Sequence, residues 1–208
     1  MNIYKSIDRQ SKYNEQHGQK QVVQRSFIMN YGNIKYFDIA DGVGVRTTLF
    51  VSGCTHHCRE CFQPETWDFD FGEEFTSVQE DEIIESLKGE FVEGLTLLGG
   101  EPFEPSNQKA LLPFLKRVRE EFPGKTIWSY SGYTWEELND PENTRCHTEH
   151  TLPMLKLLDI LVDGEFHIEE KNLGLRFRGS ANQRVLDVKR SLEKGEPVLS
   201  KYNEKELY

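Results

Sequence analysis

The chain has 208 residues, the length of one domain with a sizeable core. Its 35 acidic and 25 basic residues give a formal net charge of -10, which argues against nucleic acid or an anionic membrane surface as the main partner. No apolar run approaches the roughly 20 residues of a membrane span, and no apolar secretory signal opens the chain. Four cysteines without such a signal favour a reducing compartment, so we expect a cytoplasmic protein.

Regular patterning begins near Met29. Residues 1–28 show no sustained hydrophobic period, and we expect a flexible N-terminal extension there. One domain should follow over residues 29–192, and residues 193–208 should form a charged, loosely ordered tail.

The expected elements alternate between strands and helices. Ser77 with Glu80 three residues later is a capping-box pattern, so a helix should begin at Ser77. Pro113 argues against a straight second helix, and residues 134–147 suit a polar loop with room for one helical turn. In chain order we expect an edge strand or hairpin arm at 33–39, a strand at 45–51, a helix at 77–91, a strand at 94–98, a helix at 111–122, a strand at 125–130, a short helix at 151–157, and strands at 158–162, 173–177 and 185–188.

This alternation predicts an α/β fold with βαβ units and a parallel sheet. Ligands of such sheets gather at the carboxyl ends of the strands. Four chemically suggestive segments follow strand ends: the cysteine loop (residues 52–62), 99–102, 129–133 and 163–164. We therefore expect them to meet on one edge of the sheet.

Three of the four cysteines, Cys54, Cys58 and Cys61, form a C-x3-C-x2-C pattern. A 4Fe-4S cluster takes cysteine thiolates at its iron corners, and three ligands would leave one iron open to a substrate. Structural zinc, with His56 or His57 as fourth ligand, is the alternative, but zinc patterns usually pair two ligand clusters and the sequence has no second one. Three clustered cysteines also cannot pair as disulfides without a remainder.

Gly99, Gly100 and Glu101 follow a buried strand and suit a small zwitterion. Glycine lets the backbone approach a ligand closely, and the Glu101 carboxylate can accept charge-assisted hydrogen bonds from an ammonium group. An ordinary tight turn is the alternative, which the nearby cysteine pattern makes the weaker one.

Several other side chains have two explanations each. The Phe62 ring could pack near an aromatic ligand or lie in the core, and main chain at Glu60, Cys61 and Phe62 could hydrogen-bond a purine edge. Asp163 could bind ribose hydroxyls, although an aspartate before glycine commonly forms a turn. We expect exposed His56 and His57, a free Cys146 thiol, and surface ion pairs, or contacts to a carboxylate or partner, for Arg46, Arg178 and Arg184.

The cysteine pattern and the Gly-Gly-Glu segment resemble the radical S-adenosylmethionine superfamily. Further segments resemble one of its families, the activating proteins of the anaerobic (class III) ribonucleoside-triphosphate reductases. The resemblance covers residues 29–190 and is carried by residues 29–31, 41–46, 49–54, 66–67, 94–103 and 161–164, and by Arg178-Gly179-Ser180-Ala181-Asn182-Gln183-Arg184.

The resemblance implies an open, partial β/α barrel in which Cys54, Cys58 and Cys61 hold a 4Fe-4S cluster. S-adenosyl-L-methionine would chelate the fourth iron, with its amino end held at Gly99, Gly100 and Glu101 and its adenine facing main chain at residues 60–62. The implied reaction is reductive cleavage of this cofactor to methionine and a 5′-deoxyadenosyl radical, which takes hydrogen from a glycine of the reductase.

The implied partners are the reductase and a small electron donor such as flavodoxin, and a homodimer is compatible with the family. Glu60 departs from the superfamily, which often has an apolar or aromatic residue before the third cysteine. The Arg178–Gly179–Ser180 segment is expected to dock the partner or to close the site. Two alternatives stay open: an activase of another glycyl-radical enzyme, of the pyruvate formate-lyase type, and a zinc-binding interaction module without catalysis.

Overall fold

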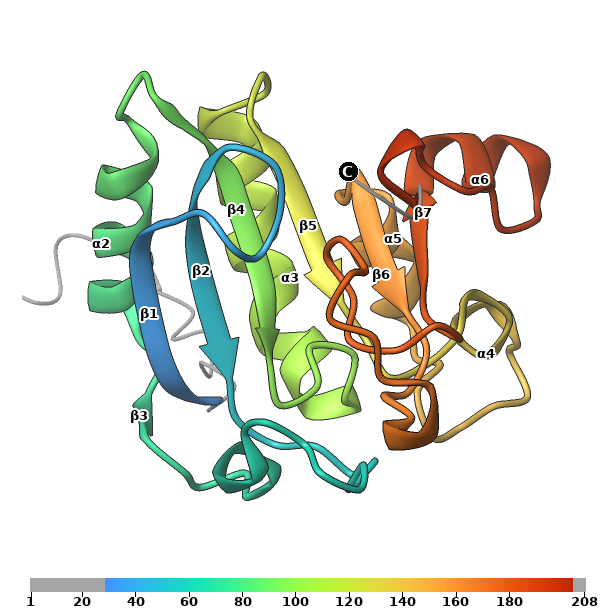
Figure 1. Cartoon of the computed structure of the whole chain (residues 1–208). Helices are drawn as coiled ribbons and strands as arrows, with labels where there is room; N and C mark the ends of the chain where they lie inside the picture. Colours follow the sequence, from blue (N-terminus) through green and yellow to red (C-terminus); the bar gives the residue numbers. More distant parts are fainter. Residues whose placement is uncertain (1–28, 204–208) are drawn as a thin grey trace, which may run out of the picture.

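A computed structural model describes residues 29–203, so the expected extension at 1–28 lies outside the described residues. Figure 1 shows one seven-stranded sheet in the order β3-β1-β2-β4-β5-β6-β7. Its strands are β1 (Asn30–Asp38), β2 (Val45–Val51), β3 (Glu73–Glu74), β4 (Val92–Gly99), β5 (Thr126–Tyr130), β6 (Ile160–Asp163) and β7 (Arg184–Asp187). The outer strands β3 and β7 do not pair with each other, so the sheet is open. The α/β class is confirmed.

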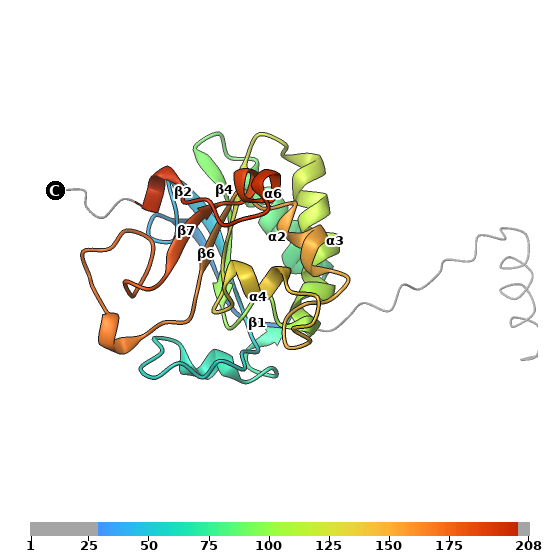
Figure 2. The ribbon, with the colours of Figure 1, turned by 90° about the vertical axis from the view of Figure 1, so that its right-hand side faces the viewer.

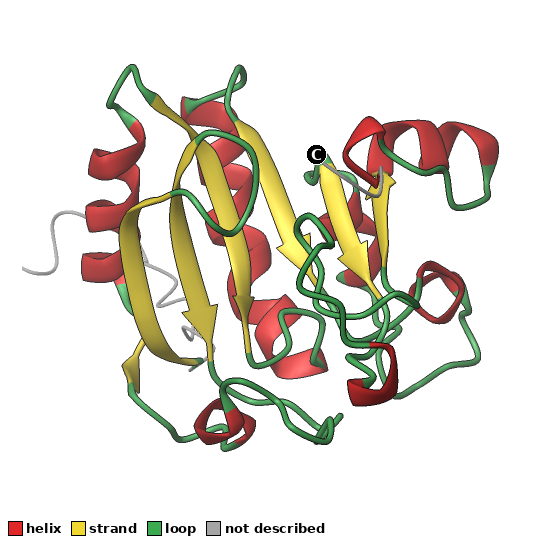
Figure 3. Ribbon diagram, in the orientation of Figure 1, coloured by secondary structure: helices red, strands yellow, loops and turns green. Residues whose placement is uncertain are grey.

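The four central strands β2, β4, β5 and β6 are parallel, whereas β1, β3 and β7 join antiparallel. The parallel strands therefore end at one edge of the sheet, the lower edge in Figures 1 and 3. The segments that follow these four ends are those that the sequence analysis singled out. Their meeting at one edge follows from the parallel register.

The helices are α2 (Ser77–Leu87), α3 (Pro105–Glu121), α4 (Trp135–Asn139), α5 (Thr151–Leu155) and α6 (Val188–Lys194), with 3-10 turns η1 (Pro64–Trp67), η2 (Ile168–Glu170) and η3 (Lys201–Asn203). Figure 2 shows α2 and α3 together on one face of the sheet. Their apolar side chains pack on strand residues such as Leu95, Leu97 and Ile127 in the main core. Among residues 29–203, no helix is long and apolar enough to cross a membrane.

The capping box of α2 begins one residue before the predicted one. Thr76 is the N-cap: its hydroxyl accepts from the Val78 N–H, and the Gln79 side chain accepts from the Thr76 N–H. Ser77 is already the first helical residue, so the predicted Ser77–Glu80 pair is wrong. Thr76 keeps an extended backbone (φ -116°, ψ 177°), which is what an N-cap requires.

The opposite face of the sheet is covered by loops instead of helices. A smaller apolar cluster of Trp128, Ile160, Val162 and Val185 lies there, and Phe177 and Tyr202 pack against it. Loop residues such as Asp41 and Phe177 line a cavity toward the carboxyl ends of the strands.

Two expectations differ from the structure, and a third is confirmed. Residues 173–177 form no strand and belong to the loop between β6 and β7. The expected boundary at residue 193 falls inside α6, and the chain beyond it packs on the sheet, with Val198 buried and Leu199 bridged to Leu186. The strand expected at 33–39 is confirmed as β1, a hairpin arm that pairs antiparallel with β2, while β3 pairs only with Asn30 and Tyr31 at its start.

Candidate functional site

A cavity of about 460 Å³ lies at the carboxyl ends of the parallel strands. The three clustered cysteines line it, together with Gly99, Gly100 and Glu101 and with main-chain neighbours Glu60 and Phe62. Cys146 does not line it and lies buried, with its thiol donating to the Glu137 carbonyl (3.4 Å). The structure thus brings together the cysteine loop, which follows β2, and the Gly-Gly-Glu segment at the end of β4.

The cysteine loop is tightly folded. The Gly53 and Cys54 N–H groups donate to the carbonyls of Thr66 and Trp67 in η1 (2.9 and 3.1 Å), so the 3-10 turn supports the start of the loop. His57 (φ 53°) and Glu60 (φ 60°) adopt left-handed backbone conformations. For residues with a side chain this conformation costs about 1 kcal/mol or more each. The surrounding contacts must offset that cost.

The thiols of Cys54, Cys58 and Cys61 are free. Burial raises the pKa of Cys54 to about 12, the charge of Glu101 adds to this shift, and hydrogen bonds from the His56 and His57 N–H groups oppose it. Burial also raises the pKa of Cys58, against a hydrogen bond from the Phe166 N–H. Both cysteines are therefore neutral thiols at pH 7 until a metal displaces their protons.

The cysteine side chains are not arranged around one ion. Within residues 29–203, no group of three His, Cys, Asp or Glu side chains could hold a single metal ion. Ligands of a 4Fe-4S cluster bind different iron corners and need not converge on one point. Three free thiols around one cavity, with N–H groups directed at two of the sulfurs, fit the cluster better than a mononuclear zinc site.

Gly99 and Gly100 are required by the packing of the chain on itself. Gly99 has φ 109°, and a Cβ there would lie 2.7 Å from Val51 backbone atoms. A Cβ on Gly100 would lie 2.5 Å from the Gly53 carbonyl oxygen. The end of β4 therefore lies directly against the start of the cysteine loop, and any larger residue would push the two apart.

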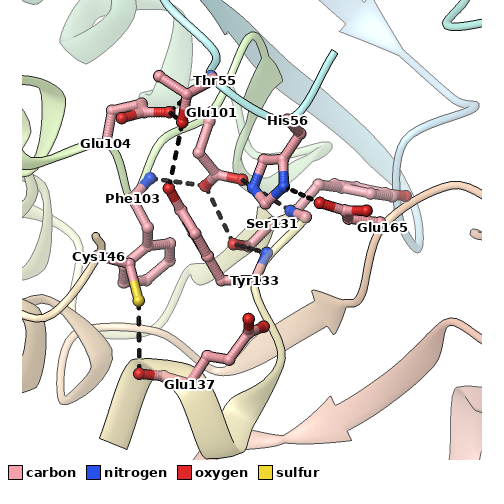
Figure 4. A network of polar contacts seen from close by, with 12 residues as sticks. Thr55, His56, Glu101, Phe103, Glu104, Ser131, Tyr133, Glu137, Cys146 and Glu165 are labelled. Carbon is pink, nitrogen blue, oxygen red and sulfur yellow. Dashed lines mark hydrogen bonds and ion pairs between the residues drawn. The ribbon is translucent and has the colours of Figure 1, made fainter. Parts of the chain in front are cut away.

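The Glu101 carboxylate already has protein partners. It accepts hydrogen bonds from the Phe103 N–H (2.7 Å), the Ser131 hydroxyl (3.0 Å) and the Gly132 N–H (2.7 Å), as Figure 4 shows. Its side chain is 1% exposed. Glu101 thus joins the loops that follow β4 and β5, and only part of its hydrogen-bonding capacity is left for a ligand.

His56 is buried between two carboxylates, so the expectation of an exposed residue is wrong. Its side chain is 3% exposed, with Nδ1 2.5 Å from Glu165 Oε1 and Nε2 3.2 Å from Glu101 Oε2 (Figure 4). Burial alone would lower the pKa of His56, but the two carboxylates outweigh it and raise the pKa. His57 is exposed, as expected, and its ring contacts Trp67.

Asp163 lies outside the cavity that the cysteines line. It belongs to a neighbouring pocket, is fully buried, and binds Arg184 through both carboxylate oxygens (3.0 and 2.5 Å). It also accepts from the Trp135 N–H (2.7 Å). Arg184 extends to Glu136, forming an ion-pair chain at the edge of the sheet.

Arg46 and Phe62 have opposite surroundings: Arg46 is buried and Phe62 is exposed. Arg46, expected at the surface, is 1% exposed and donates to Thr96 Oγ1 and to the Leu95 carbonyl (2.6 and 2.7 Å). Burial lowers the pKa of Arg46 to about 10, so it stays charged at neutral pH. Phe62 is 75% exposed at the cavity and is not a core residue.

Asp41 is a residue that the sequence analysis did not single out. It lines the cavity from the loop between β1 and β2. Burial, together with the hydrogen bond and charge of Asp38, raises the pKa of Asp41 to about 7. Burial alone would also raise the pKa of Asp38, but hydrogen bonds from Asp41, Ala40 and Thr48 lower it. The two carboxyl groups therefore share a proton near neutral pH.

Residues 40–186 match the family model described as a 4Fe-4S single cluster domain, which is well over half of the chain. The fold and the cysteine-lined cavity thus belong to a single-cluster iron-sulfur protein.

The chain is similar to proteins named anaerobic ribonucleoside-triphosphate reductase-activating protein. It is 42% identical to the one from Vibrio cholerae over 157 residues, which cover 74% of this chain and 96% of that protein. It is 43% identical to the Haemophilus influenzae protein over 157 residues, which cover 74% of this chain and 96% of that protein. It is 40% identical to the Escherichia coli K12 protein over 159 residues, which cover 76% of this chain and 97% of that protein. The chain belongs to this family, which confirms the resemblance inferred from the sequence.

Proposed function

We propose that the protein is the activating enzyme of an anaerobic ribonucleoside-triphosphate reductase and works by radical S-adenosylmethionine chemistry. The observation that carries the proposal is the cavity that Cys54, Cys58 and Cys61 share with Gly99 and Gly100. The names and high coverage of the relatives support the reductase as the target. The open sheet is compatible with the partial barrel of the radical S-adenosylmethionine type.

In this proposal the three cysteines hold a 4Fe-4S cluster. When bound, the cluster and S-adenosyl-L-methionine supply one-electron cleavage of a sulfonium bond and hydrogen abstraction from a glycine of the reductase. The chain's own residues position these groups and exclude water. The left-handed turns at His57 and Glu60 and the support from η1 hold the thiols around the cavity.

The cofactor's amino end is assigned to main chain at Gly99 and Gly100, with the Glu101 carboxylate as a neighbour already anchored by three donors. The adenine is assigned to main chain at Glu60, Cys61 and Phe62, which line the same cavity. We assign Asp163 to the architecture instead of to ribose, because Arg184 and the Trp135 N–H occupy its carboxylate.

The remaining parts of the proposal concern partners. A small electron donor of the flavodoxin type would reduce the cluster, and a homodimer is compatible with the family. We place the reaction in the cytoplasm, where cysteine thiols stay available for metal.

The test is anaerobic reconstitution with iron and sulfide, reduction in the presence of S-adenosyl-L-methionine, and assay for 5′-deoxyadenosine. We expect product from the wild type and from Cys146→Ala, whose thiol lies outside the cavity, and none from Cys58→Ala. Bound zinc without acid-labile sulfide, and no product, would refute the enzymatic proposal.

A second stage identifies the target. Addition of the reductase should produce a glycyl radical signal in electron paramagnetic resonance spectra, and addition of pyruvate formate-lyase should not. The reverse result would assign the chain to the other class of glycyl-radical enzyme.

A further inference from the structure

The Arg178–Arg184 segment has a role inside the molecule that its sequence did not indicate. It faces the strap, defined here as residues 164–171, which leaves β6 and passes along the cysteine loop. The strap contacts that loop through consecutive residues. Glu165 Oε1 lies 2.5 Å from His56 Nδ1, and the Phe166 N–H hydrogen-bonds the Cys58 sulfur. Phe166 and Cys58 also line the same cavity.

The Arg178–Arg184 segment holds the strap by a series of hydrogen bonds. Gln183 Nε2 donates to the Gly164 carbonyl (2.9 Å), Asn182 Nδ2 donates to the Glu165 carbonyl (2.8 Å), and the Ser180 hydroxyl accepts from the His167 N–H (3.1 Å). Gln183 Oε1 also accepts from the Gly179 and Ser180 N–H groups (2.8 and 3.1 Å). These contacts are made within the chain, and the Asn182 Oδ1 atom is buried without a hydrogen-bond partner among residues 29–203.

One of these hydrogen bonds, from Asn182, fixes the peptide group between Glu165 and Phe166, which lies next to Cys58. The carbonyl of Glu165 and the N–H of Phe166 belong to the same planar, trans peptide unit, in which they point in opposite directions. A donor that fixes the carbonyl therefore fixes the N–H as well. Asn182 supplies that donor on one side, and the Cys58 sulfur receives the N–H on the other.

We propose that Asn182 is a positioning residue that orients the Glu165–Phe166 peptide so that its N–H donates to the Cys58 sulfur and raises the reduction potential of the cluster bound there. This inference rests on the proposed function, because it needs a 4Fe-4S cluster at Cys58. A hydrogen bond to a ligating sulfur withdraws electron density from the iron and favours the reduced, more negative state.

The experiment compares Asn182→Ala with Asn203→Ala. Asn203 Oδ1 accepts from the Val185 N–H, next to the Arg178–Arg184 segment, so this control removes one asparagine hydrogen bond beside that segment without touching the strap; the Asn203 carbonyl, which accepts from Arg178, is kept. The midpoint potential of the reconstituted cluster is measured by titration followed by electron paramagnetic resonance.

We expect the midpoint potential of Asn182→Ala to become more negative and that of Asn203→Ala to stay at the wild-type value. A tenfold decrease in the ratio of reduced to oxidised cluster at a fixed donor potential corresponds to about 59 mV for one electron. An unchanged potential in Asn182→Ala, or an equal shift in both variants, would overturn the inference.

A second measurement uses the protein without metal. In phenylalanine-labelled protein, amide hydrogen exchange at Phe166 should be at least tenfold faster in Asn182→Ala than in the wild type, and unchanged in Asn203→Ala. Equal exchange in wild type and Asn182→Ala would refute the positioning role even if no cluster can be formed. If Asn182→Ala does not fold, Asn182→Ser, which keeps a short polar side chain, is measured in its place.

The outcomes separate the two proposals. Failure to assemble any 4Fe-4S cluster in the wild type would refute the proposed function, and the Phe166 exchange would still test the peptide's orientation. A wild-type enzyme that forms 5′-deoxyadenosine, with no shift in Asn182→Ala, would refute only the inference about Asn182.

Discussion

The hydrogen bonding and protonation of individual carboxyl groups at the site depend on their surroundings more than on their residue type. Glu101 is anchored by three donors, Asp163 by an arginine and a backbone N–H, and Asp41 by a shared proton with Asp38. Each arrangement predicts a different response to substitution. Two of these responses can be measured without any cofactor.

Glu101→Gln should destabilise the metal-free protein. The amide would present its NH2 group to a buried donor, the Gly132 N–H or the Ser131 hydroxyl, and leave that donor unpaired. Leaving a buried polar group unsatisfied costs about 1–3 kcal/mol, so we expect a loss of about 2 kcal/mol in the free energy of unfolding measured with urea. The exposed Glu90→Gln serves as control and should change stability by less than about 0.5 kcal/mol. Equal stability of both variants would show that the Glu101 carboxylate is free in solution.

Asp41→Asn should change how stability depends on pH. With a pKa raised to about 7, folded Asp41 keeps a proton that the unfolded chain loses near pH 4, so the contribution of Asp41 to the free energy of unfolding falls as pH rises from about 4 to about 7 and then levels off. The asparagine side chain of the variant cannot titrate and can still donate to Asp38. Between pH 5 and pH 8 the stability of the variant should rise relative to the wild type by about 2 kcal/mol, after allowance for partial exposure.

Urea unfolding of the metal-free protein at four pH values measures this difference. Asp70→Asn, at an exposed position, is the matched control and should follow the wild type throughout. A pH-independent difference between Asp41→Asn and wild type would mean that the two carboxyl groups do not share a proton.

At the scale of elements, hydrophobic patterning predicted the strands and the long helices well. Strands β2, β4 and β5 each contain a short apolar run and are buried at nearly every position, because both faces of a central parallel strand are covered. Residues 173–177 show a similar short apolar run, yet Leu173 is 91% exposed and no strand forms. A run that short carries too little information without a neighbouring strand to pair with.

The start of α2 gives a direct test at this scale. Thr76→Ala should cost about 1 kcal/mol of unfolding free energy, because the hydroxyl that caps the helix is lost. Ser77→Ala, at the first helical residue, should be neutral within about 0.5 kcal/mol, since alanine suits a helix at least as well. Urea denaturation of the two variants gives the comparison, and a larger cost at Ser77 would restore the cap predicted from the sequence.

Across the whole molecule, the chain after α6 completes the loop-covered face of the sheet. Val198 is buried, Tyr202 packs 5.5 Å from the Trp128 ring, and the Asn203 side chain accepts from β7. The same region fixes Arg178 through the Asn203 carbonyl. The expected loose tail is therefore part of the domain as far as residue 203.

Ending the chain at residue 197 should lower the free energy of unfolding by about 3 kcal/mol, because a buried valine and most of a tyrosine ring lose their contacts. The denaturation midpoint measures this loss. Leu199→Ala, whose side chain is 52% exposed, is the control and should cost less than about 1 kcal/mol. An unchanged midpoint in the shortened chain would show that this segment does not pack in solution.

The sequence by itself determined the α/β class and the family and singled out the three clustered cysteines, because hydrophobic period, residue spacing and local motifs are properties of neighbouring residues. Only the tertiary structure decided the surroundings of His56, Glu101, Asp163 and Arg46, and the contact of Asn182 with the strap. The contacts that define these surroundings join residues 17 to 109 positions apart along the chain, except for the short Glu101–Phe103 contact. No local pattern encodes such pairs. Burial and hydrogen bonding, which set the charge and orientation of these groups, exist only once the strands have brought the loops to one edge.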